Sequence, residues 1–150
     1  MAKVRKLSLL REVAGKVWIP PFVYRELYGK LDEDRKAIEQ ALSDFIEVHE
    51  PEPVAEGMEP YLMGLDAGER EVLELALAVG GDVVVLVDDH AAREVARSLA
   101  LRLTGTIGLL CTAKEKGLFS GVVDLLAQMR RNGYWLSDEA IEVARQLSGE

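Results

Sequence analysis

Four acidic side chains stand in or next to apolar segments of this sequence: Glu26, Glu69, Asp88 and Asp89. Glu69 falls in a helix that we expect to begin after an N-cap at Asp66 and to end at Val79, and it continues the apolar side of that helix. The same side carries Val72, Leu73, Ala76 and Gly80, whereas Arg70, Glu71 and Glu74 point toward the opposite, solvated side.

Glu26 repeats this pattern in a second helix, which we expect to open at Pro20 and Pro21 and to run to about Lys30. Phe22, Val23 and Leu27 define its apolar side, Arg25 points away, and Glu26 lies on the apolar side, so that it is predicted to face inward.

The two aspartates directly follow the aliphatic run VVVLV, residues 83–87. Because that run lacks polar alternation, it predicts a central parallel strand buried on both faces. Ligands of open parallel sheets bind beyond the carboxyl ends of the strands, which is where Asp88 and Asp89 stand.

Carboxylates that converge at such an edge have a common chemical solution, a hard divalent cation bound through oxygen. A buried carboxylate without a partner is costly and tends to protonate. Mg²⁺ or Mn²⁺ suits this ligand set better than zinc, because His49, His90 and Cys111 offer no spaced set of nitrogen and sulfur ligands.

Each acidic residue also has a structural interpretation. Glu69 sits in a first helical turn, where a carboxylate interacts favourably with its own helix. Glu26 could reach water or pair with a lysine or arginine. One of Asp88 and Asp89 could serve as N-cap of the following helix. The prediction of a metal site therefore depends on the combination.

The composition restricts the class of protein. A net charge of −8 argues against a broad basic surface for nucleic acid, so a polyanionic substrate would need a bound cation, a basic partner or a local basic cluster. Lys3, Arg5, Lys6 and Arg11 form such a cluster, or simply a soluble helix face. A single cysteine, the lack of a ~20-residue apolar run and the lack of a signal peptide predict a soluble cytoplasmic protein.

Helical and strand-like segments alternate along the chain, which predicts one α/β domain over residues 1–150 with a mainly parallel sheet. Helices are expected at residues 3–13, 21–30, 32–43, 67–79, 90–99 and 106–117, with two more ending near Gly133 and opening after Ser137; strands are expected at 16–20, 45–50, 82–87 and 101–104. Residues 50–60 have the composition of a loop. Trp18 and Trp135 are expected to be packing anchors rather than base-stacking platforms.

The combination of LDAGEREVLELALAVGGDVVVLVDDHAAREVA with TGTIGLLCTAKEKGL resembles the PIN-domain superfamily. VWIPPFVYREL and RRNGYWLSDEAIEVA resemble a PIN-like branch found in bacteria and archaea, so that the likeness covers nearly all of the chain. The resemblance implies a three-layer α/β/α nuclease, usually of RNA, that gathers acidic residues around Mg²⁺ or Mn²⁺. Many such proteins are the toxin of a toxin–antitoxin pair, which implies an antitoxin partner.

On this resemblance Glu26 matches the second acidic position of the family, Glu69 the third and Asp88 the fourth, with Asp89 as a close rival. The expected activity is a metal-dependent endoribonuclease in which these residues are catalytic and bind the metal. Arg93, one turn into the next helix, could contact a phosphate, or belong to a solvated helix face.

The family opens with a strand that ends in the first acidic residue, whereas MAKVRKLSLL resembles the helix that follows that strand. A true start upstream, a strand from another chain and a degenerate copy are three explanations. The loss is expected to leave a gap in the sheet and unpaired strand edges. The alternative function is therefore an inactive PIN scaffold that acts through protein contacts or as a homodimer.

A phosphoryl-transfer domain is a third interpretation, since receiver and dehalogenase-like folds also place aspartates at strand ends. DDH lacks the DxD spacing of the latter, and no later strand ends in the aspartate and lysine of the former. No GxxxxGK[ST] or GxGxxG motif occurs, so nucleotide binding is not indicated.

Overall fold

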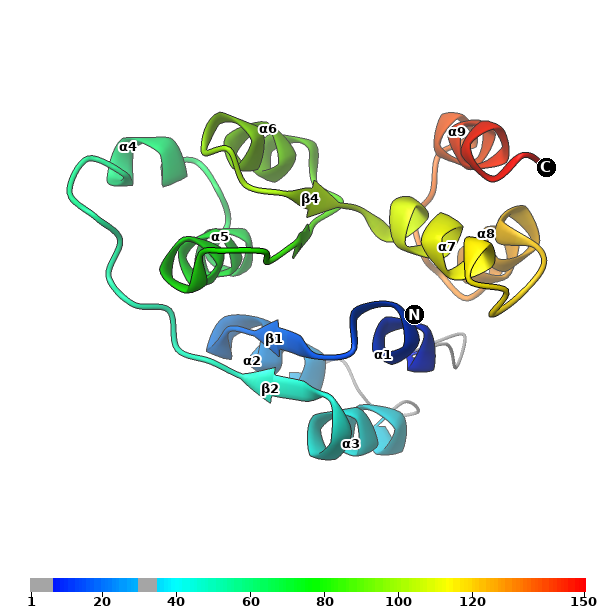
Figure 1. The fold of residues 1–150 in the computed structure, drawn as a ribbon, viewed down its shortest axis with the longest axis horizontal. Helices are drawn as coiled ribbons and strands as arrows, with labels where there is room; N and C mark the ends of the chain where they lie inside the picture. The colour runs from blue at the N-terminus through cyan, green and yellow to red at the C-terminus, as the bar shows by residue number, and fades with distance from the viewer. Residues whose placement is uncertain (1–6, 30–34) are drawn as a thin grey trace. The chain divides into compact units, whose positions relative to one another are not determined.

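The computed structural model describes residues 7–29 and 35–150 and has a mixed α/β fold with many helices and short strands (Figure 1). The helices are α1 (Ser8–Ala14), α2 (Pro21–Gly29), α3 (Arg35–Asp44), α4 (Glu59–Leu62), α5 (Ala67–Val79), α6 (His90–Ser98), α7 (Thr106–Glu115), α8 (Val122–Arg131) and α9 (Asp138–Ser148). The strands are β1 (Val17–Ile19), β2 (Ile46–Val48), β3 (Val85–Leu86) and β4 (Leu103–Thr104).

Helix boundaries follow the local signals in the sequence closely. Gly15 ends α1 with a φ of 74°, Pro21 opens α2, and Ser137 caps α9 by accepting a bond from the Ala140 amide. The loop predicted over residues 50–60 ends where the one-turn helix α4 begins, at Glu59, with Pro60 in the first turn of that helix. No helix in the described part of the chain is both long and apolar enough to cross a membrane.

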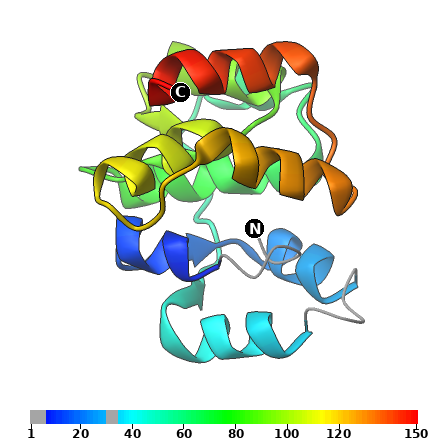
Figure 2. The same ribbon diagram turned by 90° about the vertical axis from the view of Figure 1, so that its right-hand side faces the viewer.

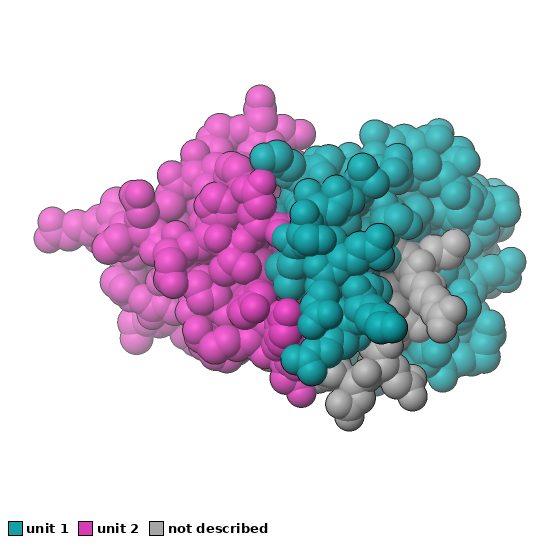
Figure 3. Space-filling view, turned by 90° about the horizontal axis from the view of Figure 1, so that it is seen from below, with its two compact units in different colours: residues 1–17, 32–45, 107–150 teal, residues 18–31, 46–106 magenta. Residues whose placement is uncertain are grey.

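Two compact units group the residues of the chain, shown in teal and magenta in Figure 3. Unit 1 comprises Met1–Val17, Asp32–Phe45 and Ile107–Glu150, and unit 2 comprises Trp18–Leu31 and Ile46–Thr106. Each unit holds an apolar cluster of its own, and a single domain over residues 1–150 stays a prediction.

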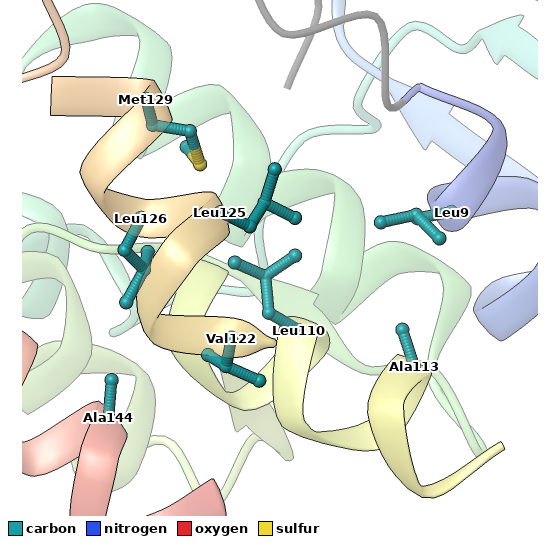
Figure 4. Packing of buried hydrophobic residues seen from close by; sticks show 8 residues of the cluster. All are labelled: Leu9, Leu110, Ala113, Val122, Leu125, Leu126, Met129 and Ala144. Atoms are coloured by element: carbon teal, nitrogen blue, oxygen red, sulfur yellow. The ribbon is translucent and has the colours of Figure 1, made fainter. Parts of the chain in front are cut away.

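The core of unit 1 is built mainly from α7, α8 and α9. Its buried members are Leu9, Leu110, Ala113, Val122, Leu125, Leu126, Met129 and Ala144 (Figure 4). Leu110 of α7 and Leu126 of α8 are fully buried, and α9 lies alongside α8 (Figure 2). Removal of these apolar side chains from water is the main force that holds the three helices together.

Glu150 ties the start of α8 to α7 within unit 1. The N-cap of α8 is Gly121, which has no side chain, and the Glu150 carboxylate instead accepts bonds from the amides of Val122 at 2.7 Å and Val123 at 2.9 Å. Lys114 Nζ donates to the same carboxylate at 2.8 Å. These bonds, that of Lys114 foremost, lower the pKa of Glu150 from 4.5 to about 2.

We expect the bonds of the Glu150 carboxylate to make the stability of the protein depend on pH. Because the folded-state pKa of Glu150 is depressed, its contribution is complete above pH 4.5 and is lost as the pH falls toward about 2. Unfolding by denaturant at several pH values should therefore show Glu150→Gln less stable than the unaltered protein at pH 7, with the difference shrinking below pH 4.5.

A matched control is Glu142→Gln, which breaks an exposed ion pair with Arg145 on α9. Exposed pairs contribute little, so this variant should follow the unaltered protein at every pH. A difference between Glu150→Gln and the unaltered protein that stays constant from pH 7 to pH 3 would contradict the assignment.

Unit 2 contains two separate two-stranded sheets, β1 with β2 and β3 with β4. In the first, the His49 amide donates to the Ile19 carbonyl at 2.9 Å. In the second, the strands are parallel and Val85 lies opposite Leu103. Among the described residues no strand joins the two pairs.

The second apolar cluster covers one side of the β3–β4 pair. It is formed by Leu62, Leu73, Ala76, Val85, Val87, Ala92 and Ala96, from α4, α5, α6 and the β3 segment. The prediction that VVVLV is buried on both faces is wrong: Val85 and Val87 are buried, but Val84 is 50% exposed and Leu86 40% exposed. Only one face of this short sheet packs against helices, so burial alternates along the strand.

Candidate acidic site

The first turn of α5 holds Glu69 and Asp66 in a reciprocal capping box. The Asp66 Oδ1 accepts the Glu69 amide at 2.8 Å, and the Glu69 Oε2 accepts the Asp66 amide at 3.1 Å. The N-cap predicted at Asp66 is confirmed. The structural interpretation of Glu69 also holds for one of its oxygens, because that oxygen satisfies an orphan donor of its own helix.

Negative charge gathers around Glu69. Partial burial raises the pKa of Glu69; the bond from the Asp66 amide opposes this shift, and the charges of Asp66 and Asp89 add to it. The charge of Asp89 therefore acts on Glu69 from the far end of β3. This coupling joins two predicted site residues that are 20 positions apart in the sequence.

The Glu26 carboxylate lies near the start of α5, next to Gly68. Gly68 is buried, and a Cβ built on it would lie 3.2 Å from the Phe22 ring and 3.5 Å from both the Glu26 Oε2 and the Asp66 Oδ1. The small residue thus lets α2 pack closely on α5. The prediction that Glu26 faces inward is wrong, since the residue is exposed, but its carboxylate does lie beside the start of α5.

The side of α5 that was expected to be solvated carries structural bonds instead. Glu71 is half-buried and accepts the amide of Phe22, in the first turn of α2, at 2.8 Å. The side chain of Glu74 is 15% exposed and accepts a bond from Arg70 Nε at 2.8 Å. Packing of α2 against α5 covers the side that carries Glu71, which the periodicity of α5 did not indicate.

Asp88 is held by a residue from the next strand-to-helix turn. The Thr106 amide donates to its Oδ1 at 2.7 Å, and the Thr106 hydroxyl donates to its Oδ2 at 2.5 Å. Gly105, just before α7, has no side chain to cap that helix, so Asp88 caps it from the end of β3. Thr106 is a buried polar residue, and its amide and hydroxyl are both satisfied by Asp88.

Arg93 lies at the same strand end. Its Nη1 donates to the Val87 carbonyl at 2.9 Å, and it is half-buried rather than part of a solvated helix face. A Cβ on Gly105 would lie 2.7 Å from the Asp88 Oδ1 and 2.9 Å from the Arg93 Nη1. Glycine is therefore required where these two charged groups meet the backbone.

Asp89 caps α6, because its Oδ1 accepts the Ala92 amide at 2.9 Å. The expectation that one of the two aspartates is an N-cap is thus met by Asp89. Its charge adds to the rise in the pKa of Glu69, which burial causes first of all. Which of Asp88 and Asp89 would bind a metal stays a prediction.

The donor chemistry fits a hard cation, although the geometry is not that of a closed metal shell. Across residues 7–29 and 35–150, no three His, Cys, Asp or Glu side chains lie close enough together to hold a metal ion. Carboxylate oxygens of Glu26 and Asp66 lie beside Gly68 at the start of α5, and burial, followed by the charges of Asp66 and Asp89, raises the pKa of Glu69. Oxygen ligands of this kind suit a hard cation.

The predicted basic cluster falls mostly outside the described residues, where Lys3, Arg5 and Lys6 lie. Arg11 is described, and its guanidinium forms an exposed ion pair with Asp44 at 3.4 Å.

The comparisons with known proteins bear on the whole chain. No curated protein and no solved structure matches it. A family model described as a PIN domain matches residues 1–150. Since that match spans every element that carries the acidic residues, the chain belongs to the PIN-domain family.

Proposed function

We propose that this protein is a ribonuclease that hydrolyses phosphodiester bonds with the help of Mg²⁺ or Mn²⁺. Membership of the PIN family indicates a nuclease-type function, and PIN domains generally depend on divalent metal ions. One observation carries the choice of site: the half-buried Glu69 has its pKa raised by burial and by two neighbouring negative charges. A divalent cation would relieve that repulsion.

Glu69, Asp89 and Glu26 are the residues that would hold the cation, with Asp88 at the same strand end as the predicted fourth ligand. The cation would supply Lewis acidity toward the phosphate and lower the pKa of a bound water.

Asp88 and Arg93 have supporting roles in this proposal. The Thr106 bonds fix the orientation of the Asp88 carboxylate, so it presents its remaining lone pairs in one direction. Arg93 uses Nη1 for the Val87 carbonyl, and its other N–H groups can offset negative charge on a phosphate.

The experiment is RNA cleavage by purified protein with Mn²⁺ and with EDTA. We expect single-stranded RNA to be cut in Mn²⁺ and to survive in EDTA, because the repelling carboxylates need the cation both to bind substrate and to stabilise developing charge. Analysis of end-labelled fragments on gels provides the measurement. Equal cleavage in EDTA would contradict the proposal.

A toxin role is a finer form of this proposal and is supported by the family resemblance alone. A toxin of this type would halt growth on expression, and an antitoxin protein would restore growth. Growth that arrests equally with Glu69→Gln would separate toxicity from cleavage and count against this role.

A second candidate function is a scaffold that pairs with another copy through β3. It is favoured by the exposure of Val84 and Leu86 on the open face of a two-stranded sheet. Light scattering should then report a dimer that Leu86→Lys weakens. A monomer at every concentration would exclude a homodimer, while cleavage by a monomer would favour the nuclease.

A further inference from the structure

The loop between α8 and α9 is short and firmly held at both ends. At the end of α8 the Gly133 amide donates to the Arg130 carbonyl at 3.0 Å, and the Tyr134 amide donates to the Met129 carbonyl at 3.0 Å. Gly133 has a φ of 83°, as this type of helix end requires. Residues 132–137 link the two helices, and the last of them, Ser137, caps α9.

Within this link one side chain points into the core and its neighbour into water. Leu136 packs against the apolar cluster of unit 1, whereas Trp135 is 87% exposed and Tyr134 is 39% exposed. The prediction that Trp135 is a packing anchor is therefore wrong. A rigid loop that displays an indole almost completely to solvent leaves unused one of the largest apolar surfaces that a side chain can bury.

The polar surroundings of Trp135 indicate what it would meet. Arg131 ends α8, is exposed, and forms no ion pair with another described residue. Its neighbour Arg130 pairs with Asp138 at 2.7 Å, which neutralises the nearest acid of α9. Trp135 thus follows Arg131 by four residues. An exposed indole and a guanidinium without an ion pair form a combination that can bind single-stranded nucleic acid, because the ring stacks on a base and the cation pairs with the phosphate.

We propose that this loop is a binding platform for single-stranded RNA, in which Trp135 stacks on an unpaired base and Arg131 contacts the backbone. RNA is chosen over a protein partner because Arg131, exposed and without an ion pair among the described residues, offers a positive charge with which a phosphate group would pair. The choice of RNA rests on the proposed function, while the platform does not involve the carboxylates of unit 2.

Fluorescence can test the platform, because the chain has two tryptophans. In the Trp18→Phe variant all indole emission comes from Trp135. Titration with oligouridylate in EDTA, where no cleavage is expected, should quench this emission, and a blunt RNA duplex should not. In the unaltered background Trp135→Ala should weaken oligouridylate binding by about 5- to 150-fold, as measured by anisotropy of a labelled oligomer.

The controls separate stacking from other effects. Trp18→Phe should bind like the unaltered protein, since Trp18 packs on the His49 ring at 4.7 Å. Trp135→Phe should bind more tightly than Trp135→Ala, because a smaller aromatic face remains. Arg131→Gln should flatten the salt dependence of binding.

Two outcomes would overturn the platform: oligouridylate affinity that is the same in Trp135→Ala, and a Trp135→Ala variant that changes only the oligomeric state, which would make the loop a protein contact. Absence of cleavage in Mn²⁺ with RNA binding intact would refute the nuclease and leave the platform standing. RNA cleavage together with an oligouridylate affinity that Trp135→Ala leaves unchanged would support the nuclease and refute the platform.

Discussion

Glu69→Gln is expected to lower the rate of Mn²⁺-dependent RNA cleavage by about 10²- to 10³-fold, as the loss of one preorganised charged group typically does. Glutamine keeps an oxygen that can accept the Asp66 amide, and a capping box tolerates glutamine at this position. The start of α5 should therefore survive, while the negative charge that attracts the cation is gone. Initial rates at saturating Mn²⁺ measure the effect.

Glu71→Gln is the matched control for this experiment. It makes the same chemical change two residues later on the same helix, where the carboxylate accepts the Phe22 amide instead of joining the acidic group around Asp66. Its cleavage rate should stay close to that of the unaltered protein. Full activity of Glu69→Gln would mean either that the site lies elsewhere or that a contaminating nuclease does the cutting.

Gly105→Ala is expected to lower the free energy of unfolding by about 2–4 kcal/mol, from overpacking together with the loss of hydrogen bonds to a charged group. The new methyl group would lie 2.7 Å from the Asp88 Oδ1, a separation that carbon and oxygen do not adopt. Asp88 would have to move, and its bonds to Thr106 would be lost or weakened. Denaturant unfolding at neutral pH gives the value.

Two further variants bracket this result. Gly29→Ala, at the end of α2, places a methyl group where nothing lies within 4 Å, and it should change stability by less than about 1 kcal/mol. Thr106→Val removes only the hydroxyl bond to Asp88 and should fall between the two. If Gly105→Ala were as stable as Gly29→Ala, the tight contact around Asp88 would be wrong.

The helices were the part of the fold that the sequence could predict, because their boundaries depend on neighbouring residues. Asp66 three residues before Glu69 defines a capping box without any knowledge of the rest of the chain, and α5 begins and ends where that signal and Gly80 place it. Ser137 and Pro21 act in the same local way.

The environment of each face could not be predicted from the sequence, because it depends on what packs there. Periodicity placed Glu71 on the solvated side of α5, yet α2 covers that side and uses Glu71 to bond its first turn. In the same way, VVVLV lacks polar alternation, but helices cover one side only and leave Val84 and Leu86 exposed. Neither outcome is encoded within a window of a few residues.

The candidate site was predictable in residue type and less so in detail. The sequence pattern selected Glu26, Glu69 and the aspartate pair, and in the structure Glu69 stands in the first turn of α5 with a Glu26 oxygen close to the neighbouring Gly68. That these residues form one metal site stays a prediction. The bond between Asp88 and Thr106 spans 18 residues and had no local signal. A glycine at position 68, directly inside a helix start, was the one available hint that another chain segment approaches closely there.

The reciprocal bonding of Asp66 and Glu69 has a consequence for which ion the protein would choose. Since the Glu69 Oε2 is already engaged by a main-chain donor, a metal that chelates through both oxygens would strip the helix of that acceptor. A metal ion that binds through one oxygen of Glu69 would leave the bond from the Asp66 amide intact. Calcium commonly takes carboxylates in the two-oxygen mode, whereas magnesium demands compact octahedral coordination and keeps much of its water. If a cation binds Glu69 as proposed, the way α5 starts would therefore disfavour calcium relative to magnesium.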